Sequence, residues 1–170
     1  VKTIGELCFN YANLGDIYLP EGLQRIETLA IFKLHEPQAK DWNVASLENI
    51  YSYKPNGVVA DSTFTSQEAL GTVYNSLPEG LLYIGSDAFS YNQAMSYMYI
   101  PASVTYIGHH AFWDTVYKDG DNLKGVAVIN VALSEEEFKE KVETGNSWRP
   151  QYDFMLFKKS IDVAYNSTRA

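Results

Sequence analysis

The sequence contains little of what several functional classes require. Its 170 residues include one cysteine, Cys8, so no disulfide can form within the chain. Lys and Arg total 13 against 21 Asp and Glu, and the net charge of −8 disfavours nucleic acid, whose phosphates attract clustered cations. No apolar run approaches the roughly 18 residues that span a bilayer. The N-terminus has no basic segment followed by an apolar one, so we expect no signal peptide in this chain.

The motifs of the common catalytic centres are also missing. The chain has no GxSxG, HExxH, Walker or GxGxxG pattern, and its acidic residues form no pair that spacing sets apart. We therefore predict that the protein is not an enzyme and that it holds no cofactor and no metal.

Tyrosine, in contrast, is abundant. The chain has 13 Tyr against 8 Phe and 3 Trp. Phenylalanine suits a dry core, whereas each tyrosine hydroxyl needs water or a hydrogen-bonding partner. This excess therefore directs attention to surfaces rather than to the core.

The sequence also repeats itself. Residues 77–89 (LPEGLLYIGSDAF) and 100–112 (IPASVTYIGHHAF) share Pro, Ile-Gly and Ala-Phe at an offset of 23 residues. Residues 19–31 and 1–9 carry the same frame, and Asp61–Phe64 is a decayed copy. A second motif, apolar-x-x-apolar-x-apolar, occurs at 14–19, 47–52, 70–75, 95–100 and 123–128. Its alternation predicts strands with one buried face, and such short units must stack to bury that face.

Together these two motifs resemble the BspA-like (Treponema-type) leucine-rich repeats, whose unit reads IP-x-x-V-x-x-IG-x-x-AF followed by L-x-x-I-x-I. The resemblance covers roughly residues 1–128. Glu27, Ile31 and the insertions 33–45 and 116–122 depart from the pattern. The resemblance implies a curved solenoid in a secreted or surface-displayed bacterial protein, often adhesive, and it implies no catalysis.

From these patterns we predict a β-rich α/β leucine-rich-repeat solenoid forming a single structural domain. It should have a parallel sheet of about five short strands on its concave face, and short 3-10 or helical turns near the Ala-Phe positions. Residues 1–129 would be the repeats, truncated at the N-terminal end. Residues 130–170 would be a C-terminal cap with one helix near 134–144 and a trailing strand segment. Ser134 and Glu137 form a capping box for this helix, and Gly145 is a plausible stop. The predicted core residues are Ile4, Phe9, Ile26, Phe64, Ile84, Phe89, Ile107 and Phe112.

Three features that could carry chemistry have simpler structural interpretations. His109 and His110 lie in a solvated turn and are expected to point in different directions, which disfavours a shared metal ion. The segment 114–121 has three Asp around Gly120 and could be a weak calcium loop, but without EF-hand spacing a polar turn is favoured. Cys8 takes a position that other copies fill with alanine, which predicts a buried and unreactive thiol.

The tyrosines gather at one position of the strand motif. The fifth position, which should face outward, holds Tyr18, Tyr51, Tyr74, Tyr99 and Ala127. Neighbouring strands lie ~4.8 Å apart, so four tyrosines would form a ladder. Such a ladder braces a sheet, and it also suits recognition of proteins or sugars. The ligand-binding residues of this hypothesis are Asp16, Tyr18, Glu48, Asn49, Tyr51, Tyr74, Tyr97 and Tyr99.

Two functions remain in contention. The first is a non-catalytic extracellular binding or adhesion module that contacts a protein or glycan through its concave face. The alternative is a structural or assembly segment of a larger surface protein, with no ligand of its own. In that case the open N-terminal edge would pair with further repeats or with another copy.

Overall fold

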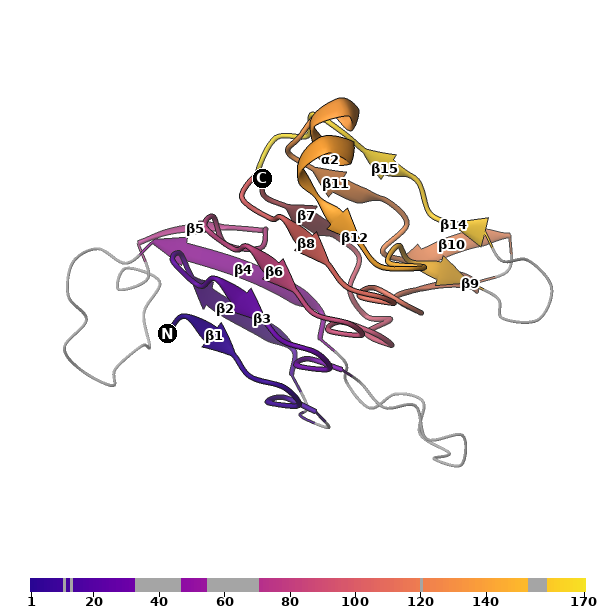
Figure 1. The fold of residues 1–170 in the computed structure, drawn as a ribbon. Helices are drawn as coiled ribbons and strands as arrows, with labels where there is room; N and C mark the ends of the chain where they lie inside the picture. Colours follow the sequence, from indigo (N-terminus) through magenta and orange to yellow (C-terminus); the bar gives the residue numbers. More distant parts are fainter. Residues whose placement is uncertain (11, 13, 33–46, 55–70, 120, 153–158) are drawn as a thin grey trace.

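The computed structural model describes residues 1–10, 12, 14–32, 47–54, 71–119, 121–152 and 159–170 (Figure 1). Its largest sheet has five parallel strands in the order β1-β3-β6-β8-β12. These strands are β1 (Thr3–Ile4), β3 (Arg25–Ile26), β6 (Tyr83–Ile84), β8 (Tyr106–Ile107) and β12 (Glu143–Thr144). Each strand has two residues, and the first four end on the isoleucine of the repeat. Successive repeats therefore stack in register, Ile4 beside Ile26, Ile26 beside Ile84, and Ile84 beside Ile107.

The second motif forms two separate three-stranded sheets. One contains β2 (Asp16–Pro20), β4 (Asn49–Lys54) and β5 (Thr72–Tyr74), and the other contains β7 (Met98–Ile100), β11 (Ile129–Val131) and β15 (Val163–Ala164). The prediction of one parallel sheet with a strand from each of the five motifs is therefore wrong. The interruption lies at β5, which pairs with β4 in the antiparallel direction.

The last predicted strand is also displaced. In place of a strand over 123–128, β9 (Val116–Asp119) and β10 (Asn122–Gly125) form an antiparallel hairpin. The strand beside β7 is β11, in which Asn130 pairs with Tyr99. The insertion in the last repeat therefore adds a hairpin before the chain returns to the sheet.

The Ala-Phe segments form turns rather than the predicted 3-10 or helical segments. Each of five repeats has a residue with positive φ two positions after its glycine, or after Glu27 where glutamate replaces that glycine. The φ of these residues lies between 53° and 58°: Leu7, Leu29, Asp87, His110 and Ser147. This left-handed conformation cannot continue a right-handed helix, so each turn ends after a few residues. The recurrence at one repeat position marks five equivalent turns in the described chain.

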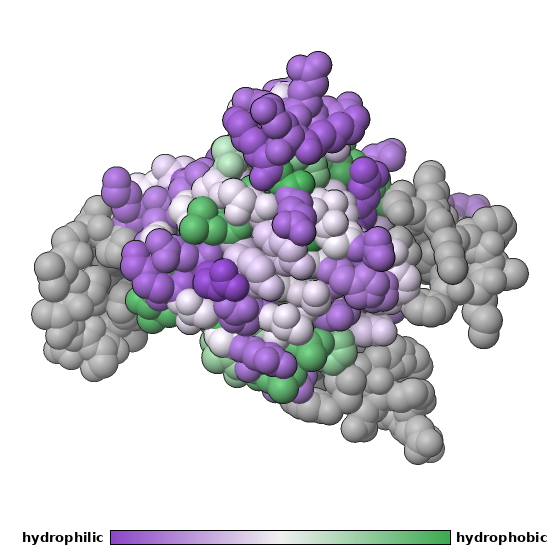
Figure 2. Space-filling model, viewed as in Figure 1, coloured by the Kyte–Doolittle hydropathy of each residue, from purple (hydrophilic) through white to green (hydrophobic). Residues whose placement is uncertain are grey.

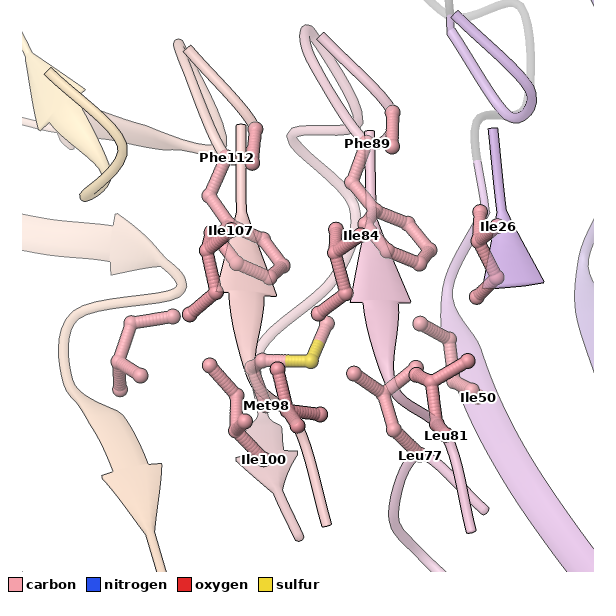
Figure 3. Packing of buried hydrophobic residues seen from close by; sticks show 14 of the residues in the cluster. Ile26, Ile50, Leu77, Leu81, Ile84, Phe89, Met98, Ile100, Ile107 and Phe112 are labelled. Carbon is pink, nitrogen blue, oxygen red and sulfur yellow. The ribbon is translucent and has the colours of Figure 1, made fainter. Parts of the chain in front are cut away.

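Apolar side chains fill the space between the five-stranded sheet and the other two sheets (Figures 1 and 3). The predicted core is confirmed at Ile4, Ile26, Ile84, Ile107, Phe89 and Phe112, all of which are buried. Phe9 is half-buried against this core, and the predicted Phe64 lies outside the described residues. Burial of these residues supplies most of the stabilisation, at about 25 cal/mol per Å² of apolar surface.

The helix α2 (Glu135–Lys141) lies within the predicted range. Its capping box is confirmed, because Ser134 Oγ accepts from the Glu137 amide and the Glu137 carboxylate accepts from the Ser134 amide. Phe138 and Val142 are both buried, and their four-residue spacing places them on one face. Two short strands, β13 (Gln151–Tyr152) and β14 (Lys159–Ser160), follow as an antiparallel pair.

Gly145 does not stop the helix, because the helix ends at the C-cap Val142 and β12 follows. A Cβ on Gly145 would lie 2.3 Å from the backbone nitrogen of His109, and a Cβ on Gly108 would lie 2.4 Å from that of Ser86. Gly145 is therefore the glycine of a further stacked turn, and the sequence reading missed this repeat.

Cys8 is exposed, which contradicts its predicted burial. The equivalent Ala30, Ala88 and Ala111 are fully buried. These alanines belong to turns with neighbours on both sides, whereas Cys8 belongs to the first turn of the stack. Burial at this position therefore depends on an adjacent repeat.

Candidate functional site

Two of the predicted tyrosines form an exposed stack. Tyr18 on β2 pairs in parallel register with Tyr51 on β4, as the predicted ladder requires. Their ring centroids are 5.0 Å apart, the planes are inclined by 28°, and Tyr18 is 45% exposed. The short parallel strands set this spacing, because residues in register on neighbouring strands lie side by side.

Polar groups lie beside this stack. Asp16 and Asn49 are also in register, and Asn49 Nδ2 donates to Asp16 Oδ1 at 2.8 Å. The exposed Glu48 precedes β4, and its amide donates to the Gly15 carbonyl. Partial burial, followed by the charge of Asp16, raises the pKa of the Tyr51 hydroxyl. We call Asp16, Tyr18, Glu48, Asn49 and Tyr51 the Tyr18–Tyr51 face.

Tyr74 does not extend this ladder. Because β5 is antiparallel to β4, Tyr74 pairs with Ser52 instead of Tyr51. Its ring lies under the guanidinium of Arg169, with Cζ 3.6 Å from the ring centroid. Tyr74 therefore already has a partner from the C-terminal segment.

The remaining predicted tyrosines lie on or beside β7, in the other three-stranded sheet. Tyr97 is half-buried, and Tyr99 is only 4% exposed. Asn130 on β11 pairs in register with Tyr99, and Ala164 on β15 pairs with Asn130. Ala127, which was predicted to follow Tyr99 in the ladder, therefore does not lie beside it. The structure thus brings together Asp16, Tyr18, Glu48, Asn49 and Tyr51, and separates Tyr74, Tyr97 and Tyr99 from them.

A second aromatic row runs across the five-stranded sheet. The rings of Tyr83 and Tyr106 stack with centroids 4.7 Å apart and planes 7° apart. The Arg25 guanidinium covers Tyr83 at 3.9 Å, and Glu143 pairs in register with Tyr106. The sequence reading missed this row, although a Tyr precedes Ile-Gly in both of the best-matched repeats.

The two adjacent histidines also form a stack. The ring centroids of His109 and His110 are 3.6 Å apart, which contradicts the expectation that they point in different directions. Trp113 continues the stack, 4.1 Å from His110, and Asp87 Oδ1 lies 3.9 Å from His110 Nδ1. Desolvation, and then the neighbouring His109, lower the pKa of His110, while Asp87 opposes the shift.

The part of the chain that the structure describes contains no group of three His, Cys, Asp or Glu residues placed to hold a metal ion. Of the segment 114–121, for which a polar turn was favoured over a calcium loop, Asp121 lies in the turn of the β9–β10 hairpin, and Gly120 lies outside the described residues. In the same part of the chain, no helix is long and apolar enough to cross a membrane.

Comparison with protein families identifies the repeat. Residues 1–118 match the BspA type Leucine rich repeat region in six copies. Comparison with curated proteins and with solved structures gave no match. This family fits a repeat solenoid and suggests a protein-binding or repeat module, and it is typically non-catalytic. The stacked Ile-Gly strands and the recurring left-handed turns agree with the match, which spans more than half of the sequence. The chain therefore belongs to the BspA-type leucine-rich repeat family.

Proposed function

We propose that this chain is a non-catalytic binding or adhesion module of a secreted or cell-surface bacterial protein. Its binding surface is the Tyr18–Tyr51 face, on the concave side of a repeat solenoid. Residues 1–129 supply the repeats, and residues 130–170 cap them. The observation that carries the proposal is the exposed stack of Tyr18 on Tyr51.

The chemistry of this face suits a protein or glycan ligand. Tyrosine offers rigid contact area and a hydrogen-bonding tip at a low cost in side-chain entropy. The two hydroxyls, the Asp16 carboxylate and the Asn49 amide add donors and acceptors beside the rings. Membership of a repeat family that suggests protein binding supports the same conclusion.

The double variant Tyr18→Ala/Tyr51→Ala tests this proposal. Wild-type and variant chains are applied to arrays of purified extracellular proteins and glycans, and circular dichroism checks that both are folded. We expect the variant to lose the signals that the wild type gives. The matched control is Tyr83→Ala/Tyr106→Ala, which removes the other stacked tyrosine pair and should retain binding. Retained binding by the first variant, or equal loss in both, would contradict the proposal.

An assembly role is the second candidate, and the exposed edge at β1 favours it. Within the described residues β1 is the end strand of its sheet, and Leu7 in the turn that follows it is 46% exposed. Figure 2 shows hydrophobic surface over the turn that follows β1, in contrast to the hydrophilic surface around α2. Unpaired strand edges favour association. Sedimentation should then show self-association that Leu7→Lys weakens, whereas a monomer at all concentrations contradicts this role.

A further inference from the structure

Four residues that are distant in the sequence converge on the side chain of Arg169. Its Nη2 donates to the Glu21 carboxylate and to Ser52 Oγ at 2.7 Å, and its Nε donates to Ser76 Oγ at 3.0 Å. Its Cζ lies 3.6 Å from the centroid of the Tyr74 ring. We call Glu21, Ser52, Tyr74 and Ser76 the guanidinium site.

The guanidinium site is held in place by contacts that do not involve Arg169. Ser52 on β4 and Tyr74 on β5 are partners in the antiparallel ladder. The hydroxyls of Ser52 and Ser76 lie 3.0 Å apart, within hydrogen-bonding distance of each other. The site is therefore preorganised, which reduces the entropy lost when a ligand binds.

Ser52 departs from the apolar pattern of the repeat. Its register partner on β2 is Leu19, and the corresponding last residues of β7 and β11 are Ile100 and Val131, all of them buried. A buried hydroxyl in such a column is unfavourable unless it has hydrogen-bonding partners. Ser52, the polar exception among these residues, is the one that accepts a hydrogen bond from the Arg169 guanidinium.

The site has the chemistry that distinguishes arginine from lysine. A carboxylate and a hydroxyl oxygen accept from Nη2 and a second hydroxyl oxygen accepts from Nε of one planar group, while an aromatic ring covers its face. Arginine presents five donors in a fixed plane and stacks on aromatic rings, whereas lysine presents a compact point charge. A lysine in the same position could not satisfy all four residues.

The segment that carries Arg169 is attached by few contacts. After β15, the Asn166 amide donates to the Leu133 carbonyl and the Ser167 amide donates to the Val131 carbonyl, both at 2.9 Å. The Asn75 amide donates to the Ala170 carbonyl at 3.1 Å. The segment belongs to none of the sheets and ends near β5 (Figure 1). Its release would leave every strand pair intact, so the opening is local, and it breaks these backbone bonds together with the contacts of Arg169.

We propose that the guanidinium site recognises an arginine side chain in an extended segment of another polypeptide, and that Arg169 occupies this site within the chain. The incoming arginine displaces residues 166–170. Because an attached segment acts at an effective concentration of about millimolar, a natural partner needs additional contacts to compete. None of its four residues belongs to the Tyr18–Tyr51 face, so the inference does not rest on the proposed function.

The full chain with Arg169→Ala provides the test. The probe is a capped pentapeptide with the sequence of residues 166–170, followed by NMR titration up to millimolar concentration. We expect the peptide to bind the variant saturably. A peptide with lysine in place of the arginine should bind the variant at least tenfold more weakly. The original peptide should also bind the wild type more weakly than the variant, because Arg169 fills the wild-type site. Equal binding of arginine and alanine peptides, or no binding to the folded variant, would overturn the inference.

Two further measurements keep the test decisive. The first is binding of the peptide to the double variant Ser52→Leu/Arg169→Ala, which has leucine at the position that pairs with Leu19 on the neighbouring strand. This variant should fold but should not bind the peptide. In the wild type, saturating peptide should speed hydrogen exchange at the Ser167 amide by releasing it from Val131. Unchanged exchange at saturation contradicts displacement.

Discussion

The rings of Phe89 and Phe112 lie parallel in the core, with centroids 5.4 Å apart and planes 1° apart. These residues occupy the same position in two repeats that are offset by 23 residues. Their backbones are linked as well, since the Phe89 amide donates to the Ala111 carbonyl. The identities between the two repeats thus correspond to a ring stack that couples one repeat to the next (Figure 3).

Replacing Phe112 with alanine should lower the free energy of unfolding by about 3–5 kcal/mol, because it removes a fully buried ring and leaves a cavity. Urea denaturation measures this loss. Phe9→Ala is the matched control, since Phe9 has the same repeat position but is only half-buried, and its loss should be clearly smaller. Equal losses for the two variants would mean that stacking between repeats is not the source of the stabilisation.

Gly108→Ala should destabilise the protein by about 1–3 kcal/mol, because overpacking forces the backbone to shift. The added Cβ would lie 2.4 Å from the backbone nitrogen of Ser86 in the preceding turn. Gly5 is the equivalent glycine of the first repeat, where a Cβ would meet nothing within 4 Å. Gly5→Ala should therefore change the stability by no more than about 0.5 kcal/mol. Thermal unfolding of both variants checks this difference, which similar melting temperatures would refute.

Stability should fall between pH 7.5 and pH 5.5, in part through His110. Burial and His109 lower the pKa of His110 below its ordinary value of 6.5. The unfolded chain then takes up a proton more readily than the native protein, so this contribution is complete above pH 6.5 and decreases as the pH falls. His110→Asn should reduce the pH dependence, and asparagine tolerates the φ of 54° at this position. The free energy of unfolding at the two pH values measures the effect, and identical slopes would rule it out.

The buried core was predictable because it follows from periodicity. Isoleucine and phenylalanine at fixed repeat positions can be buried only when repeats stack, and Ile26, Ile84, Phe89 and Phe112 are buried accordingly. Ser134 and Glu137 were predictable for a similar reason, since a capping box depends on residues three positions apart.

The candidate site was predictable only in part. The strand motif placed Tyr18 beside Tyr51 correctly because β2 and β4 pair in parallel. The same motif failed at Tyr74, because β5 pairs antiparallel with β4 and a motif of alternating residues does not specify the direction of a strand. Tyr99 was assigned to an exposed column, yet it is buried in the separate sheet around β7.

The sequence by itself determined the repeat family, the residues of the core and the position of the helix, because all three depend on spacing along the chain. Only the tertiary structure decided which strands are neighbours, that Cys8 lies at an exposed end of the stack, and that Arg169 reaches Glu21 across 148 residues of sequence. These contacts depend on where the stack of repeats is interrupted and where the C-terminal segment returns to it. No local pattern encodes that path.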